Sequence, residues 1–138
     1  MAITMWHPRQ LIGGMCHYML PSCPENKKGN SPNGRYADDV IGLFMKEIEN
    51  ANSRPCEYRV KIFGGGNQFA PRNASSKTSI SQNNIQSGKY LLKKHGFSID
   101  AEHIGGDGYR NVIFDISNGD VWMKHVLKLQ IPEPCAKA

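Results

Sequence analysis

Two residue types that can do nucleophilic chemistry, a cysteine and a histidine, stand side by side at Cys16 and His17. A thiolate can attack a carbonyl carbon, and a neighbouring imidazole can move the protons that this attack requires. The two residues lie in an apolar segment, 12–20, that predicts a strand. Strand alternation sends His17 to one face with Met15 and Met19, and Cys16 to the other face. The adjacent pair is therefore a poor catalytic couple, and His17 taken alone predicts a packed, hydrogen-bonded residue.

The other three cysteines are Cys23, Cys56 and Cys135. None of the four forms a C-x-x-C pair, and their spacing fits no zinc framework. An even count is compatible with disulfides, but no export signal indicates an oxidising compartment. We therefore expect four free, structural or inert thiols and no bound metal.

A run of three glycines, 64–66, follows a strand-like segment and invites comparison with a phosphate-binding loop. The following residues, Asn67 and Gln68, supply neither the helix start nor the Lys-Ser/Thr pair of a Walker loop. The run predicts a tight turn or a close approach of the backbone.

Hydrophobic periodicity and turn residues predict the elements that position these groups. The expected strands are 2–7, 12–20, 58–63, 97–104, 111–117 and 121–129, and the expected helices are 36–50 and 81–95. Asn118-Gly119 predicts a two-residue type I′ hairpin turn. The order favours one α+β domain over residues 1–138, with two helices on a mixed β-sheet in a layered sandwich. Residues 21–34 form a long loop, and 130–138 a tail.

Bulk properties narrow the class of protein. The 138 residues carry a formal net charge of +5, which favours acidic partners, nucleic acid first. The basic residues are dispersed, however, and no zinc-finger or KH-like signature accompanies them. No apolar run is long enough to cross a membrane and no secretory signal is visible, so a cytoplasmic protein without membrane insertion or a nucleic-acid partner is expected.

Several segments, in order along most of the chain, resemble the CheD family of chemoreceptor glutamine deamidases. They are 13–21 (GGMCHYMLP), 35–37 (RYA), 61–66 (KIFGGG), 80–84 (ISQNN), 105–110 (GGDGYR) and the final hairpin. Each motif alone is weak, but the ordered set is specific.

The resemblance implies a function. CheD proteins hydrolyse glutamine side-chain amides, and in some cases methyl esters, on methyl-accepting chemotaxis receptors, and they bind the CheC-type phosphatase. They use a cysteine, a histidine and a supporting threonine, with no cofactor. The family's histidine corresponds to His17, which reverses the expectation of a merely packed residue. Backbone amides at Gly64, Gly65, Gly105 and Gly106 are candidate oxyanion or substrate-binding groups.

The chain departs from the family pattern in two places. The family's nucleophile lies in a Gly-Ser-Cys segment that would come immediately before Met1, so we expect this chain to lack the nucleophile and, as given, to be inactive. An inactive CheD-like adaptor that binds a CheC-type phosphatase or receptor helices is the alternative function. Ser81 and Asn83 also replace a usual glycine and arginine, which is either neutral variation or altered partner recognition.

Overall fold

The structure is a computed structural model, and it describes residues 1–67 and 79–127. The described strands are β1 (Ala2–His7), β2 (Ile12–His17), β3 (Arg59–Gly64), β4 (Ile99–Ile104), β5 (Tyr109–Phe114) and β6 (Val121–Val126). The helices are α1 (Ala37–Asn50) and α2 (Ile80–Lys94), with short 3-10 turns η1 (Glu25–Lys27) and η2 (Pro55–Glu57). The predicted order of strands and helices is confirmed. The predicted tail, 130–138, lies outside the described residues.

Four strands form one sheet in the order β2-β1-β3-β4, and β5 and β6 pair separately. The pairs β1·β2 and β1·β3 are antiparallel, whereas β3 and β4 run parallel. A parallel pair requires a crossover connection, and α2 supplies it here. The mixed sheet of the predicted α+β fold is therefore present.

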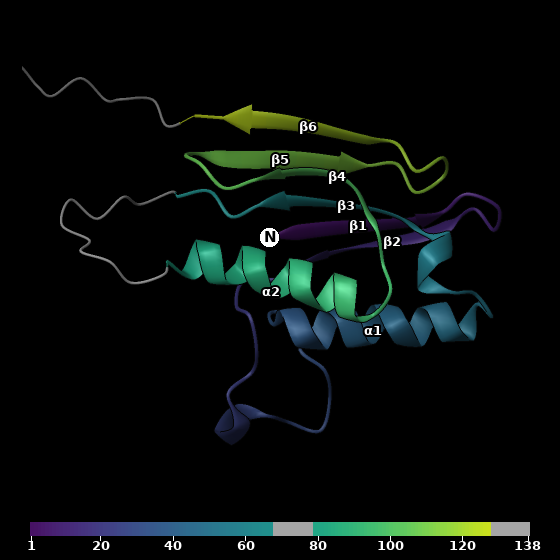
Figure 1. Cartoon of the computed structure of the whole chain (residues 1–138), viewed down its shortest axis with the longest axis horizontal. Coiled ribbons are helices and arrows are strands. Elements are labelled where there is room, and N and C mark those ends of the chain that lie inside the picture. Colours follow the sequence, from purple (N-terminus) through teal and green to yellow (C-terminus); the bar gives the residue numbers. More distant parts are fainter. Residues whose placement is uncertain (68–78, 128–138) are drawn as a thin grey trace, which may run out of the picture.

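The elements are stacked in three layers (Figure 1). Both helices cover one face of the four-stranded sheet, and the β5–β6 hairpin lies over the other face. Contacts with opposite ends of the hairpin anchor it: Trp6 Nε1 donates to the carbonyl oxygen of Ile116 at 3.2 Å, and Arg110 Nε donates to His103 Nδ1 at 3.0 Å. The layered arrangement follows from strand alternation, since each face of the sheet has to be covered separately.

The hydrophobic core fills the space between the sheet and the helices. It is made of residues from β1, β3, both helices and their connections, among them Ile3, Met5, Tyr18, Val40, Ile41, Ile62 and Leu92. In α1 the buried residues include Val40, Ile41 and Ile48, whereas Leu43 is 40% exposed. In α2 the fully enclosed positions are Asn84, Gly88 and Leu92, spaced by four residues.

Local signals set the ends of both helices. Asp38 and Asp39 lie in the first turn of α1, where they complement the helix dipole. Ser79 caps α2, because its side-chain oxygen accepts from the Gln82 amide at 3.2 Å. Gly96 follows α2 with a φ of 86°, a left-handed conformation that suits glycine at the end of a helix.

The predicted two-residue hairpin turn is wrong. The β5–β6 register pairs Phe114 with Val121, so six residues connect the strands. Asp115 closes this loop: its amide donates to the Asp120 carbonyl, its carbonyl accepts from the Gly119 amide, and its carboxylate accepts from Ser117. The aspartate therefore organises a wider turn, in which Gly119 alone adopts a positive φ, 81°.

Candidate active site

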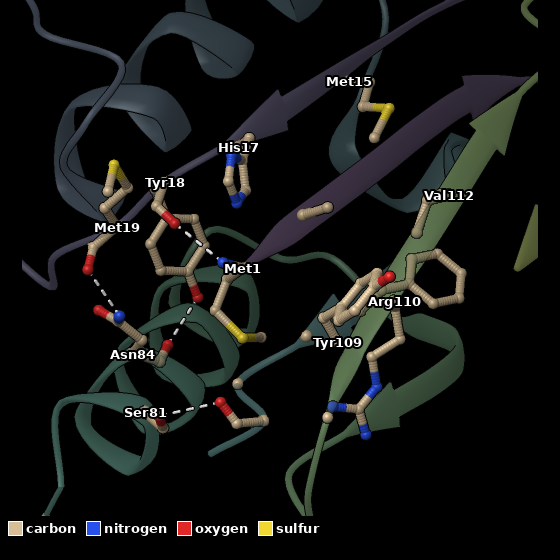
Figure 2. A pocket seen from close by; sticks show the side chains of 16 residues that line it. Met1, Met15, His17, Tyr18, Met19, Ser81, Asn84, Tyr109, Arg110 and Val112 are labelled. Carbon is tan, nitrogen blue, oxygen red and sulfur yellow. Dashed lines mark hydrogen bonds between the residues drawn. The ribbon is translucent and has the colours of Figure 1, made fainter. Parts of the chain in front are cut away.

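His17 lines a cavity of about 600 Å³ at the end of β2. The cavity is bounded by the start of β1, the glycine turn that follows β3, the first turns of α2 and the inner side of β5 (Figure 2). Met15 and Met19 lie on either side of His17 along the chain, and their side chains are 44% and 59% exposed. The cavity thus combines a titratable ring with apolar side chains at its mouth.

The electrostatics of the cavity favour a neutral imidazole at His17. Partial removal from water lowers the pKa of His17, and the positive amino terminus of Met1 lowers it further. A neutral ring nitrogen can accept a proton, which is what a general base has to do.

The first residue of the chain lies beside His17. Ala2 is the register partner of His17 in the β1·β2 ladder. Met1 extends this ladder: its nitrogen donates to the Tyr18 carbonyl and its carbonyl accepts from the Tyr18 amide, both at 2.9 Å. The backbone nitrogen of Met1 is therefore fixed at the edge of the cavity, next to the His17 ring in Figure 2.

A second set of contacts ties the residues after His17 to α2. Tyr18 Oη donates to the Asn84 carbonyl at 2.6 Å, and Asn84 Nδ2 donates to the Met19 carbonyl at 2.7 Å (Figure 2). Tyr18 is fully buried, and any side chain at Gly88 would collide with its hydroxyl. These contacts hold the chain on the C-terminal side of His17 against the helix.

The four predicted glycines divide into two groups. Gly64 and Gly65 line the cavity, whereas Gly105 and Gly106 lie behind them and are not among its lining residues. The Gly105 amide donates to the Gly64 carbonyl at 2.9 Å, and the Gly106 carbonyl accepts from Asn67 at 2.8 Å. The second glycine pair thus supports the turn that carries the first.

Backbone conformation explains why these positions are glycine. Gly64 and Gly65 have φ values of 114° and 69°, which side-chain-bearing residues rarely adopt. A Cβ on Gly65 would also lie 2.6 Å from the side chain of Ile85. Ser81 lines the same cavity, and its hydroxyl donates to the Gly66 carbonyl at 3.5 Å. Asn83 does not line it.

The cysteines of the described residues do not join His17 in the cavity. Cys16 packs against the helix-side core, and burial raises the pKa of its thiol to about 11. Cys23 is buried in the loop before α1, Cys56 is exposed in η2, and all three are unbridged. The expectation that Cys16 and His17 face opposite sides of β2 is confirmed. Cys135 lies outside the described residues.

Asn84 and Arg110 line the cavity although sequence reasoning gave them no role. Arg110 was noted only as part of a matching motif, and Asn84 only as the end of another. A usable signal existed for Asn84, since it lies four residues before Gly88 on the buried face of α2, where a polar side chain needs partners.

Neither a metal site nor a membrane-spanning helix is found in residues 1–67 and 79–127. No group of three or more His, Cys, Asp or Glu side chains in these ranges is arranged to hold a metal ion. No helix in these ranges combines the length and apolar character that spanning a membrane requires.

Comparison with known proteins gives consistent matches over most of the chain. The family model described as "CheD chemotactic sensory transduction" matches residues 19–125. A probable chemoreceptor glutamine deamidase CheD of Pseudomonas syringae pv. tomato is 38% identical over 125 residues, covering 90% of this chain and 73% of the relative. A relative of the same description from Dechloromonas aromatica is 38% identical over 126 residues, covering 88% and 71%. One from Leptospira interrogans is 32% identical over 129 residues, covering 89% and 76%.

The fold and the cavity define a layered α+β protein with a histidine at the junction of sheet, hairpin and helix. The chain belongs to the CheD family.

Proposed function

We propose that this protein hydrolyses glutamine side-chain amides, and methyl esters in the same site, on methyl-accepting chemotaxis receptors in the cytoplasm. The relatives are named chemoreceptor glutamine deamidases, and this chain matches them over nine-tenths of its length. The observation that carries the proposal is the shared cavity, in which His17, Met1 and the glycine turn meet. His17 is the proposed catalytic residue.

The proposed reaction proceeds through a thioester. Neutral His17 first takes the proton of the cysteine thiol. The resulting thiolate attacks the amide carbon of the glutamine, and the imidazolium of His17 gives that proton to the departing ammonia. Neutral His17 then takes a proton from water, and the resulting hydroxide attacks the thioester. Glutamate and the free thiol are released, so one water is consumed and one ammonia is formed for each glutamine.

The nucleophile is proposed to be a cysteine encoded upstream of Met1. The position of Met1 supports this assignment, because its nitrogen is held beside Tyr18 at the cavity edge. A residue joined to that nitrogen would therefore start at the edge of the cavity, close to His17. Cys16 is unsuited to the role, since it faces the core and burial disfavours its thiolate.

The glycine turn is the proposed oxyanion-binding element. Gly64 and Gly65 line the cavity with His17, and no described residue accepts a hydrogen bond from the Gly65 amide. Backbone amides held in advance near the reacting carbonyl stabilise the charge that develops on its oxygen. Gly105 and Gly106 contribute as supports of this turn, through their contacts with Gly64 and Asn67.

The surface around the His17 cavity is the proposed docking surface for receptor helices and for a CheC-type phosphatase. The exposed apolar side chains of Met15, Met19 and Tyr109 line the cavity that contains His17. Methionine adapts its shape to different partners, which suits a surface that binds more than one protein.

The experiment is to express the protein with the codons that precede Met1 in its gene and to incubate it with a receptor cytoplasmic segment. Mass spectrometry then reads the conversion of glutamine amide to acid. Conversion that disappears in His17→Ala supports the enzyme. Binding of the receptor or the phosphatase without conversion would leave the adaptor function instead.

A further inference from the structure

The side chain of Arg110 bridges three parts of the molecule beside the cavity. It projects from the inner face of β5, where its Nε donates to His103 Nδ1 on β4 at 3.0 Å. Its Nη2 donates to the carbonyl of Gly105, in the turn after β4. The Gly105 amide in turn donates to the Gly64 carbonyl, so two hydrogen bonds connect the guanidinium, which itself lines the cavity, to the glycine turn.

The glycine turn is built around this guanidinium. A Cβ on Gly66 would lie 2.5 Å from Arg110 Nη1 and would also collide with the Gly108 carbonyl. The absence of a side chain at Gly66 therefore allows the turn to approach the arginine closely. Any movement of Arg110 changes the space into which the 64–66 turn is packed.

No carboxylate in residues 1–67 or 79–127 pairs with Arg110. The ion pairs among the described residues are Arg9–Glu57, Lys28–Glu25, Arg54–Glu57 and Lys89–Glu102. Arg110 Nη1 is enclosed and has no hydrogen-bond partner there. Placing a cation in such an environment opposes folding, and burial lowers the pKa of the guanidinium accordingly. A contribution of Arg110 to folding stability therefore does not explain why an arginine occupies this position.

His103 completes the arrangement. Because its Nδ1 accepts from Arg110, the ring proton of neutral His103 lies on Nε2. The His125 ring packs edge-on against His103 at a centroid distance of 5.0 Å, and His125 Nε2 bonds to the Asp107 carbonyl at 2.7 Å. His103 thus orients the arginine, and His125 holds both the His103 ring and the loop that connects β4 to β5.

We infer that Arg110 is a positioning residue, which acts through His103 and Gly105 to fix the glycine turn 64–66 on the wall of the His17 cavity. The inference rests on the proposed function, because the turn matters for catalysis only if it binds the substrate carbonyl. Arg110 also lines the cavity, and the role inferred for it is to hold the turn in place.

The first measurement uses nuclear magnetic resonance on the 138-residue chain and needs no catalytic activity. In Arg110→Lys and His103→Leu, the amide signals of Gly65 and Gly66 shift. The amides of Gly105 and Asn67, which donate across the turn, exchange with solvent at least about threefold faster, as expected when the turn loosens. His103→Asn keeps an acceptor near the Nδ1 position and restores the wild-type signals. Lys124→Ala, on the exposed face of the same hairpin, is the matched control.

The second measurement determines kcat and KM for deamidation, using a protein extended upstream of Met1. Arg110→Lys lowers kcat about ten- to a hundredfold and changes KM less than about threefold. The control Lys124→Ala leaves both constants unchanged. Unchanged glycine amides in a folded Arg110→Lys protein, or an unchanged kcat, would overturn the inference. An inactive wild type would instead overturn the proposed function, and the glycine amides would then decide the positioning role alone.

Discussion

The side chains of Cys16 and His17 lie on opposite faces of β2: Cys16 packs into the core beneath the helices, and His17 opens into the cavity beneath the hairpin. The peptide bond between them thus separates two environments. On the core side, burial raises the pKa of the thiol to about 11. On the cavity side, the pKa of the imidazole is lowered.

This separation predicts slow alkylation of Cys16. At pH 8 the thiolate fraction of a thiol with a pKa of about 11 is roughly 240-fold smaller than that of a thiol at the reference value of about 8.5. Cys56 is exposed and serves as the internal comparison. Iodoacetamide labelling followed by peptide mass spectrometry is expected to modify Cys56 long before Cys16. Equal rates in the folded protein would contradict the burial of Cys16.

The lowered pKa of His17 predicts where kcat/KM for deamidation falls as the pH is lowered, which is the acid limb of the pH profile. The imidazole stays neutral, and able to act as a base, until the pH falls below its lowered pKa. The limb in kcat/KM is therefore expected below about pH 6.5, the ordinary histidine value. In a protein extended upstream of Met1, a peptide bond replaces the ammonium group of Met1, which removes the smaller cause of the lowered pKa and leaves burial. A limb above about pH 6.5 would contradict this assignment.

The contact between Tyr18 and Gly88 predicts a measurable coupling. Gly88→Ala is expected to destabilise the fold by about 1–3 kcal/mol, since a methyl group there overlaps the Tyr18 hydroxyl. Tyr18→Phe costs about 0.5–1.5 kcal/mol through loss of the bond to the Asn84 carbonyl, but it relieves the overlap. Urea unfolding of the two single variants and the double variant measures the coupling. Strictly additive effects would contradict the packing described.

The glycine turn predicts a contrast between two glycine-to-alanine variants. Gly65→Ala combines a φ of 69° with the collision at Ile85, so loss of deamidation and lower stability are expected together. Gly42→Ala, on the exposed side of α1, meets nothing within 4 Å and is expected to stabilise the protein by about 0.5–1 kcal/mol. Full activity in Gly65→Ala would remove the glycine turn from the mechanism.

Local patterns were sufficient for the elements and for the orientation of His17. Alternation in β2 and helical spacing in α1 and α2 depend on neighbours within a few residues, and they predicted these elements to within a few positions. The hairpin loop was mispredicted because Asp115 and Asp120 close it outside the Asn118-Gly119 pair. Backbone hydrogen bonds across the loop outweighed the turn preference of that pair.

The supporting residues of the site are long-range features. Asn84 contacts Met19 across 65 residues, and Arg110 reaches the glycine turn only because β3, β4 and β5 meet at one end of the molecule. No local pattern in the sequence carries such contacts. Periodicity could have marked Asn84 as a polar residue on a buried stripe, but it could not have named its partner.

The central claim is tested most directly by comparing the upstream-extended protein with its His17→Ala variant on one receptor cytoplasmic segment. The account predicts that wild type replaces a glutamine amide with an acid, releasing ammonia, and that His17→Ala reduces the rate by about a hundredfold or more while the variant stays folded. Lys124→Ala, on the exposed face of the hairpin and outside the cavity lining, is the matched control and is expected to stay active. A folded His17→Ala protein that deamidates at the wild-type rate would contradict the account.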